Sequence, residues 1–297
     1  MTLADFLADS PLLLAAAVFA LGLIVGSFLN VVTHRLPIMM ERAWRAHCAE
    51  LLDQAAPAAT EPYNLVSPRS ACPSCDAPIR AWHNIPVLSW ILLKGRCSAC
   101  GHRISVRYPI IELVTAAASA VVAWRFGFGW ETAAALLLTW ALIAASAIDL
   151  DRQLLPDSIT LPLLWAGLAF SLLHSEIAGA SLFIDPTSSI IGAIAGYSSL
   201  WSVYTLFKLM TGREGMGFGD FKLLAALGAW LGWQMLPLIV LGSAFVGAAV
   251  GIALIVFGER GRHVPMPFGP YLAAAGWVAL LWGHEIVGAY LRVSGLV

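Results

Sequence analysis

The sequence predicts an all-α polytopic membrane protein of about eight transmembrane helices, with a cytoplasmic loop that resembles a zinc ribbon. Hydrophobic residues make up 59% of the 297 residues and charged residues 12%, far below the roughly 25% of charged residues in a soluble domain. The apolar residues form long runs suited to membrane-spanning helices. Four of the five cysteines form two closely spaced pairs in a polar segment. The net charge of −1 favours no nucleic-acid partner, and the lipid bilayer is the expected environment.

The first transmembrane helix is predicted from about Pro11 to Val32, and residues 1–33 are expected to form an N-terminal part. At ~1.5 Å rise per residue this run is long enough to cross a hydrocarbon core of ~30 Å. The first basic residue is Arg35, so the basic start of a cleavable signal peptide is missing and none is expected. Asn30 lies inside the apolar run, and we expect its side chain to hydrogen-bond to another helix.

The polar segment 34–108 is predicted to be a cytoplasmic loop. It contains more than half of the 17 Lys and Arg residues of the chain. Because basic residues are enriched on the cytoplasmic side of membrane proteins, we expect this loop there and the N-terminus on the other side.

The loop contains the motifs Cys72-Pro-Ser-Cys75 and Cys97-Ser-Ala-Cys100. The two-residue spacing lets both thiolates of a pair face one ion, and two pairs supply the four ligands of a tetrahedral zinc site. A disulfide framework is the alternative, but a cytoplasmic loop lies in a reducing compartment. We therefore expect a structural zinc site with no open position for catalysis. Cys48 lies outside both pairs and is interpreted as an ordinary thiol.

Residues 109–297 are predicted to form a membrane domain of seven helices. Glu112 lies near its start and is interpreted as a helix-start carboxylate, with a buried site residue as the alternative. Pro156 followed by Asp157 is typical of a helix start, with Asp157 as the N-cap. The predicted spans are 109–124, 130–148, 155–173, 188–209, a sixth and a seventh within 221–257 that are separated near residues 232–237, and an eighth that ends near Tyr290.

Two carboxylates are expected at the cytoplasmic boundary of the membrane. Asp149 ends a predicted inward-going helix, and Asp220 begins an outward-going one after the glycine-rich segment 215–219. Ionisable groups at membrane depth are costly and therefore indicate a functional site. Two carboxyl groups in close contact share one proton, so one can activate a water while the other polarises a carbonyl. This chemistry is that of an aspartic peptidase.

Two other functions stay open on the residues alone. A proton-coupled transporter also uses intramembrane carboxylates, although it gives no role to the cysteine loop. A non-catalytic scaffold of a secretion machine would use both aspartates as helix caps. The absence of G-x-S-x-G and H-E-x-x-H motifs argues against the serine hydrolases and zinc peptidases that carry them.

Four motifs occur together: Gly26–Val32 followed by His34–Pro37, the two cysteine pairs, Asp149 eight residues before Asp157, and a Gly-x-Gly-Asp that ends at Asp220. In this combination the chain resembles the prepilin leader peptidases of type IV pilus and type II secretion systems over essentially its whole length. The last motif alone also resembles presenilin-like and preflagellin peptidases.

This resemblance implies an enzyme of the bacterial inner membrane that removes the leader of prepilins and pseudopilins, cutting after a Gly. It implies a catalytic pair of Asp149 and Asp220, whereas Asp151 has the wrong spacing to match the family pattern. It also implies that S-adenosylmethionine donates a methyl group to the new N-terminal residue. Both termini are then expected in the periplasm and the active site at the cytoplasmic face. A G-x-G-x-x-G fingerprint for the methyl donor is not present.

Overall fold

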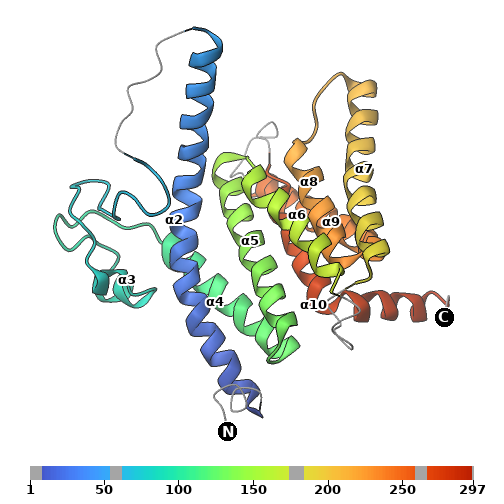
Figure 1. Cartoon of the computed structure of the whole chain (residues 1–297), viewed down its shortest axis with the longest axis horizontal. Coiled ribbons are helices and arrows are strands. Elements are labelled where there is room, and N and C mark those ends of the chain that lie inside the picture. Colours follow the sequence, from blue (N-terminus) through green and yellow to red (C-terminus); the bar gives the residue numbers. More distant parts are fainter. Residues whose placement is uncertain (1–8, 54–61, 174–183, 258–265, 296–297) are drawn as a thin grey trace. The chain divides into compact units, whose positions relative to one another are not determined.

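The computed structural model describes residues 9–53, 62–173, 184–257 and 266–295 (Figure 1). Within these ranges every regular element is a helix, and the only extended pairing is two isolated β-bridges beside the cysteine pairs. The all-α class predicted from the sequence is therefore confirmed. The chain forms two compact units, Met1–Phe128 and Gly129–Val297, and each is described by itself. The three-part division at residues 33 and 108 stays a prediction.

The first unit is built on helix α2 (Pro11–Leu51), which is much longer than the predicted first span. The helix does not end at Val32 but continues through Pro37, and its exposed last part contains the ion pair between Arg45 and Glu41. Hydropathy reports where a helix leaves the apolar core, whereas a helix continues while its backbone bonds are kept. The start of the polar segment is therefore helical rather than irregular.

Helix α4 (Arg107–Phe126) packs against α2 through small residues. A Cβ atom at Gly22 would lie 2.6 Å from the Cα of Ala116, and one at Gly26 would lie 2.7 Å from the Cα of Glu112. Backbones come this close only where side chains are small, as in the small-xxx-small pattern of membrane helices. The side-chain amide of Asn30 donates to the carbonyl of Tyr108 at 3.1 Å, which confirms the expected bond between helices.

The segment between these helices holds two short helices, η1 (Ala81–Asn84) and α3 (Leu88–Leu92). Its start is fastened to α2 by the buried Arg35, which donates to the carbonyls of Asn64 at 2.9 Å and Pro68 at 2.7 Å. The described start of the polar loop, residues 64–68, is thus attached to helix α2 through the Arg35 side chain.

The second unit consists of α5 (Trp130–Arg152), α6 (Asp157–Ser171), α7 (Pro186–Thr211), α8 (Phe218–Leu231), η2 (Trp233–Met235), α9 (Leu236–Val256) and α10 (Gly269–Val293). Its centre is α8, which is buried along almost its whole length. Gly192 of α7 faces Gly228 of α8 so closely that a Cβ atom on either would overlap the other's backbone. Most of the packing of α8 is against α7 and α6, seen around it in Figure 1.

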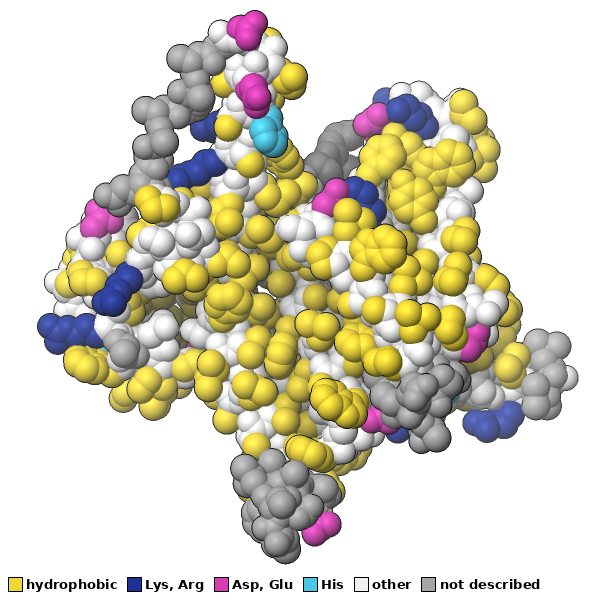
Figure 2. All heavy atoms as spheres, viewed as in Figure 1, with side chains coloured by type: hydrophobic (Ala, Val, Ile, Leu, Met, Phe, Trp, Pro, Cys, Tyr) yellow, Lys and Arg dark blue, Asp and Glu magenta, His cyan; other side chains and the backbone are white. Residues whose placement is uncertain are grey.

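All eight predicted spans correspond to helices, but they differ in length. In the described part of the chain, six helices are long and apolar enough to cross a membrane. Helices α6 and α8 have only 15 and 14 residues, or ~22 and ~21 Å at ~1.5 Å per residue, against a ~30 Å hydrocarbon core. Large exposed apolar side chains cover much of the visible face in Figure 2, as expected for contact with lipid. The protein is therefore a membrane protein in which the short helix α8 is buried among its neighbours, whereas the short helix α6 keeps an exposed face.

Candidate active site

Asp149 lies at the C-terminal end of α5 and is 5% exposed. Its Oδ2 atom accepts a hydrogen bond of 3.1 Å from the backbone N–H of Gly269, the first residue of α10. The free N–H groups at a helix start are uncharged donors, and they stabilise a carboxylate although they supply no full positive charge. The start of α10 therefore fixes the orientation of the Asp149 side chain.

Asp220 lies in the first turn of α8 and is 7% exposed. Its backbone N–H donates to the carbonyl of Gly217, the residue that precedes the helix. The Asp149 and Asp220 carboxyl groups are close enough for their charges to interact, so the fold brings these two side chains together from opposite ends of their helices. This is the pairing of Asp149 and Asp220 that their predicted depth in the membrane suggests.

Leu155 packs against the starts of α8 and α10, next to this pair. A Cβ atom at Gly219 would lie 2.7 Å from the Cβ of Leu155, and one at Gly269 would lie 3.0 Å from its Cδ1. Both glycines are therefore required for close approach. Asp220 follows the first of them and Asp149 binds the second, so one buried leucine positions both carboxylates.

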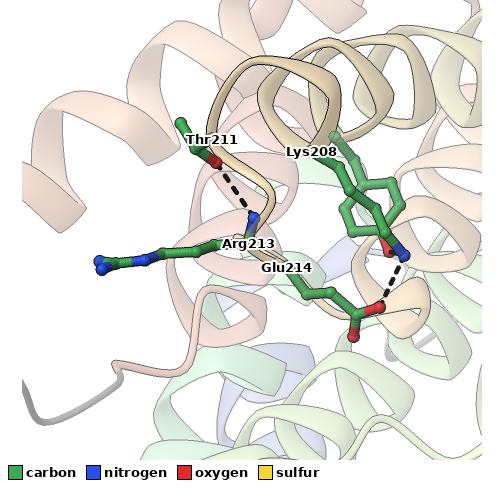
Figure 3. Close-up of polar contacts among 5 residues, drawn as sticks. Lys208, Thr211, Arg213 and Glu214 are labelled. Atoms are coloured by element: carbon green, nitrogen blue, oxygen red, sulfur yellow. Dashed lines mark hydrogen bonds and ion pairs between the residues drawn. The ribbon is translucent and has the colours of Figure 1, made fainter.

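The turn between α7 and α8 carries the glycine-rich segment to Asp220. Gly212 ends α7 with φ of 68°, a conformation that suits glycine, and the N–H of Arg213 donates to the hydroxyl of Thr211. Figure 3 shows the Lys208 side chain directed at Glu214, with 2.8 Å between the ammonium and the carboxylate. Its hydrogen bond and charge lower the pKa of Glu214 below the ordinary value. The turn therefore has an internal ion pair of its own.

Lys222 and Asp157 join the starts of α8 and α6. The Lys222 ammonium lies 2.6 Å and 2.7 Å from the two carboxylate oxygens of Asp157. The interpretation of Asp157 as an N-cap was wrong, because Pro156 occupies that position and Asp157 is the first helical residue. Asp151, the rival carboxylate, is exposed at the end of α5.

The four paired cysteines of the first unit gather in one cluster. The sulfur atoms of Cys72, Cys75, Cys97 and Cys100 all lie within 4.8 Å of one another, and those of Cys72 and Cys100 are 3.8 Å apart. With Zn–S bonds of about 2.3 Å, a regular tetrahedron places its sulfur atoms about 3.8 Å apart. The cluster can therefore hold a metal ion, while the exposed Cys48 lies outside it.

The two cysteine pairs have the same backbone fold. In each, the first cysteine N–H bonds to the carbonyl five residues later, Ala77 in one and His102 in the other. The residue after the second cysteine has positive φ, 54° at Asp76 and 73° at Gly101. Such a turn directs both thiols of a pair to one side, as a shared ion requires.

The close packing of the four cysteines also shifts the pKa values of two of their thiols. Hydrogen bonds from the backbone N–H groups of Cys100 and Ala99 lower the pKa of Cys97 to about 7. At Cys75 the backbone N–H of Ala77 acts in the same direction but is outweighed by the neighbouring thiols, Cys100 foremost, and by burial, which together raise the pKa to about 12. A divalent cation among the sulfurs stabilises all the thiolates at once, so the donor set suits a metal ion.

Comparison with known proteins agrees with this division into a cysteine unit and an aspartate unit. Residues 20–126 match the bacterial peptidase A24 N-terminal domain, and residues 136–252 match the type IV leader peptidase family. A prepilin leader peptidase/N-methyltransferase of Stutzerimonas stutzeri is 54% identical over 296 residues, covering 100% of both chains. The chain belongs to the type IV leader peptidase family.

Two further relatives in this family carry the same description. The Pseudomonas aeruginosa protein is 53% identical over 295 residues and the Aeromonas salmonicida protein 56% identical over 283 residues, covering 99% and 95% of both chains respectively. No solved structure matches the chain significantly. Asp149 and Asp220 lie in the peptidase match, and the four cysteines lie in the N-terminal match.

Sequence reasoning missed the roles of three residues around the pair: Gly269, which binds Asp149, Leu155, which packs against Gly219 and Gly269, and Lys222, which binds Asp157. The only available signal was for Gly269, in the run Pro267-Phe-Gly-Pro270 before the last span, where a glycine next to a proline indicates a turn. Glu112 was also misassigned, since it lies beyond the first turn of α4 and is buried.

Proposed function

We propose that this protein is a membrane aspartic peptidase that removes the leader of type IV prepilins and type II secretion pseudopilins. It cuts after a Gly and then methylates the new N-terminal residue, with S-adenosylmethionine as methyl donor. The observation that carries the proposal is the pair of buried carboxylates at the meeting point of three helix ends, in a chain about half identical to proteins named for both activities.

The chemistry follows from the state of the pair. Two adjacent carboxyl groups hold one proton between them, because the second ionisation is opposed by the first. The ionised group takes a proton from a water, and the oxygen of that water attacks the scissile carbonyl while the protonated group donates to the carbonyl oxygen. Collapse of the tetrahedral intermediate breaks the C–N bond, and the amine leaves with a proton from the pair. The Gly269 N–H keeps Asp149 oriented through these steps.

The cysteine cluster serves the loop rather than the hydrolysis. Cys72, Cys75, Cys97 and Cys100 would hold a zinc ion, and four thiolates fill its tetrahedral shell and leave no place for a substrate. Bound zinc supplies a fixed connection between the two cysteine turns. The basic loop supports a cytoplasmic position for this unit, with the protein in the inner membrane and both termini in the periplasm.

A transporter is less well supported than a peptidase. Proton relays use intramembrane carboxylates in chains, whereas here the buried aspartates of the second unit form one pair among the residues that the structure describes. The curated relatives are named as peptidases and methyltransferases.

The test is substitution of each aspartate by asparagine in the full-length protein. Asp149→Asn and Asp220→Asn keep the side-chain shape but cannot share a proton, so each should lower prepilin cleavage at least ~1,000-fold. Asp151→Asn removes a nearby exposed carboxylate and should cleave normally. Normal processing by either buried variant removes that residue from the mechanism.

Methyl transfer is measured separately on a pre-cleaved pilin with a free N-terminal amine. Folded Asp220→Asn enzyme should still methylate this substrate, because the reaction depends on positioning an amine against a methyl donor rather than on the carboxyl pair. Mass spectrometry of the product decides the matter. Loss of methylation in this variant alone would mean that the aspartate serves both reactions, and loss in wild type would leave a peptidase only.

A further inference from the structure

Glu112 is a buried carboxylate that the proposed hydrolysis does not use. It lies in α4, one of the helices able to span a membrane, and is 8% exposed. Among the residues that the structure describes, no Lys, Arg or His forms an ion pair with it. An ionisable group inside a membrane helix is costly, and one retained without a cation partner indicates a functional site.

The contacts of Glu112 come from uncharged donors on two neighbouring elements of its unit. Its Oε2 atom accepts a bond of 2.7 Å from the backbone N–H of Val87, and the hydroxyl of Ser27 lies within hydrogen-bonding reach. Val87 lies in the loop between the two cysteine pairs, and Ser27 lies on α2. These donors orient the carboxylate but leave its charge unbalanced, so a ligand with positive charge can complete the site.

The backbone at Val87 is strained where it meets this carboxylate. Val87 has φ of 60° and ψ of −50°, and the N–H of Leu88 bonds to the carbonyl of Pro86, which together make a γ-turn of the rare left-handed kind. A β-branched residue at positive φ is an outlier, and such strain is concentrated at functional sites. The chain thus holds an unfavourable turn so that the Val87 N–H points at Glu112.

We propose that Glu112 binds the α-ammonium group of the cleaved substrate and accepts its proton before methyl transfer. The inference rests on the methyl-transfer half of the proposed function. Leader cleavage creates a terminal ammonium, which is the cation that the site lacks. Glu112 belongs to the same compact unit as the four cysteines, whereas the aspartate pair belongs to the other unit.

The proposed step is balanced in protons and electrons. The ammonium gives one proton to the Glu112 carboxylate and becomes a neutral amine, and with an ordinary pKa of about 7.7 a terminal ammonium gives up its proton more readily than that of a lysine. The nitrogen lone pair attacks the methyl carbon of a sulfonium donor, the C–S bond breaks and its electron pair stays on sulfur. The methylated nitrogen remains a charged secondary ammonium, and Glu112 gives its proton to water, which restores the carboxylate. The main contribution of Glu112 is to hold the nitrogen in place.

The first experiment compares Glu112→Gln with Glu50→Gln in the full-length enzyme. The amide oxygen of the glutamine introduced by Glu112→Gln can still accept the Val87 N–H, so the turn is kept and only the charge is removed. Methylation of a pre-cleaved peptide should fall roughly 10- to 100-fold, the effect of losing a bond between charged groups. Glu50 is exposed at the end of α2 and its variant should methylate normally. Metal content and leader cleavage, measured on the same preparations, report whether each variant is folded.

The second experiment uses the wild-type enzyme and does not depend on a variant. A membrane-permeant carbodiimide joins a carboxylate to an adjacent amine with loss of water, so the free N-terminus of the peptide should become linked to Glu112. Mass spectrometry should find this amide with the free peptide and not with an N-acetylated one. Links to other carboxylates with none to Glu112 would overturn the proposal.

The outcomes separate this inference from the proposed function. If wild type does not methylate the peptide, methyl transfer is refuted and the inference falls with it. If wild type methylates and a metal-bearing Glu112→Gln does so at the same rate, the inference alone is refuted. If Glu112→Gln loses its metal, the cross-link in wild type decides.

Discussion

Gly269→Ala is the substitution that most directly tests how Asp149 is held. A Cβ atom at this position would lie 2.6 Å from Asp149 Oδ2, whereas ordinary contact begins at 3.4 Å, so the carboxylate must move by about 0.8 Å. Two carbon atoms of Leu155 would lie 3.0 Å and 3.2 Å from the new methyl group, so the methyl group is crowded on that side as well. The alanine keeps the N–H donor, so only the position of the carboxylate changes. Misplacement of a reacting group by ~1 Å can cost ~100-fold in rate, and we expect a loss of about that size in prepilin cleavage.

The matched control is Gly288→Ala in the same helix. A Cβ atom there meets nothing within 4 Å, so alanine should leave cleavage unchanged and stabilise α10 by about 0.5–1 kcal/mol. The assay is leader cleavage by purified full-length enzyme at saturating prepilin, with thermal unfolding measured in parallel. Equal cleavage rates for the two variants would show that the start of α10 does not position Asp149, and the reasoning would fail.

Two further predictions concern the cysteine cluster and the ion pair beside the aspartates. Purified wild type should contain about one zinc per chain, since four thiolates complete one shell. Cys72→Ser should lose the zinc and expose the loop to protease, whereas Cys48→Ser should keep the zinc. If metal-free wild type resisted protease as well as the zinc-bound protein does, a structural role for the metal would be contradicted. Lys222→Met and Asp157→Asn should each lower cleavage several-fold while costing at most about 1 kcal/mol of stability, as for a partly exposed pair. The exchange of both charges should recover part of the activity, and full activity in the single variants would exclude a positioning role.

The helices could be predicted from the sequence because each depends on local composition. Long apolar runs give the spans, and the two-residue cysteine spacing gives the turns of the cluster, since neighbouring residues alone determine both. Asp149 and Asp220 could be proposed as site residues for the same reason, because a charge at the end of an apolar run is visible without the fold. The structure brings these two residues together.

The contacts between distant residues could not be predicted. Gly269 lies 120 residues from Asp149, and nothing near either one indicates that a backbone N–H meets a carboxylate. The true end of α2 was missed because polar residues stop a membrane span without stopping a helix. Glu112 was assigned to a helix start from its place near Pro109, whereas the long-range contact with Val87 defines its surroundings.

The Lys222–Asp157 pair also bears on the state of the aspartates. Lys222 follows Asp220 by two residues, and a cation beside the pair would favour ionisation of both carboxyl groups and abolish the shared proton on which the proposed hydrolysis depends. Both oxygens of Asp157 bind the Lys222 ammonium instead and direct it to the start of α6. In the described chain neither aspartate has an ion pair, and the donor to Asp149 is a neutral backbone N–H. Asp157→Asn therefore tests more than helix packing, because it frees a positive charge next to the reacting pair.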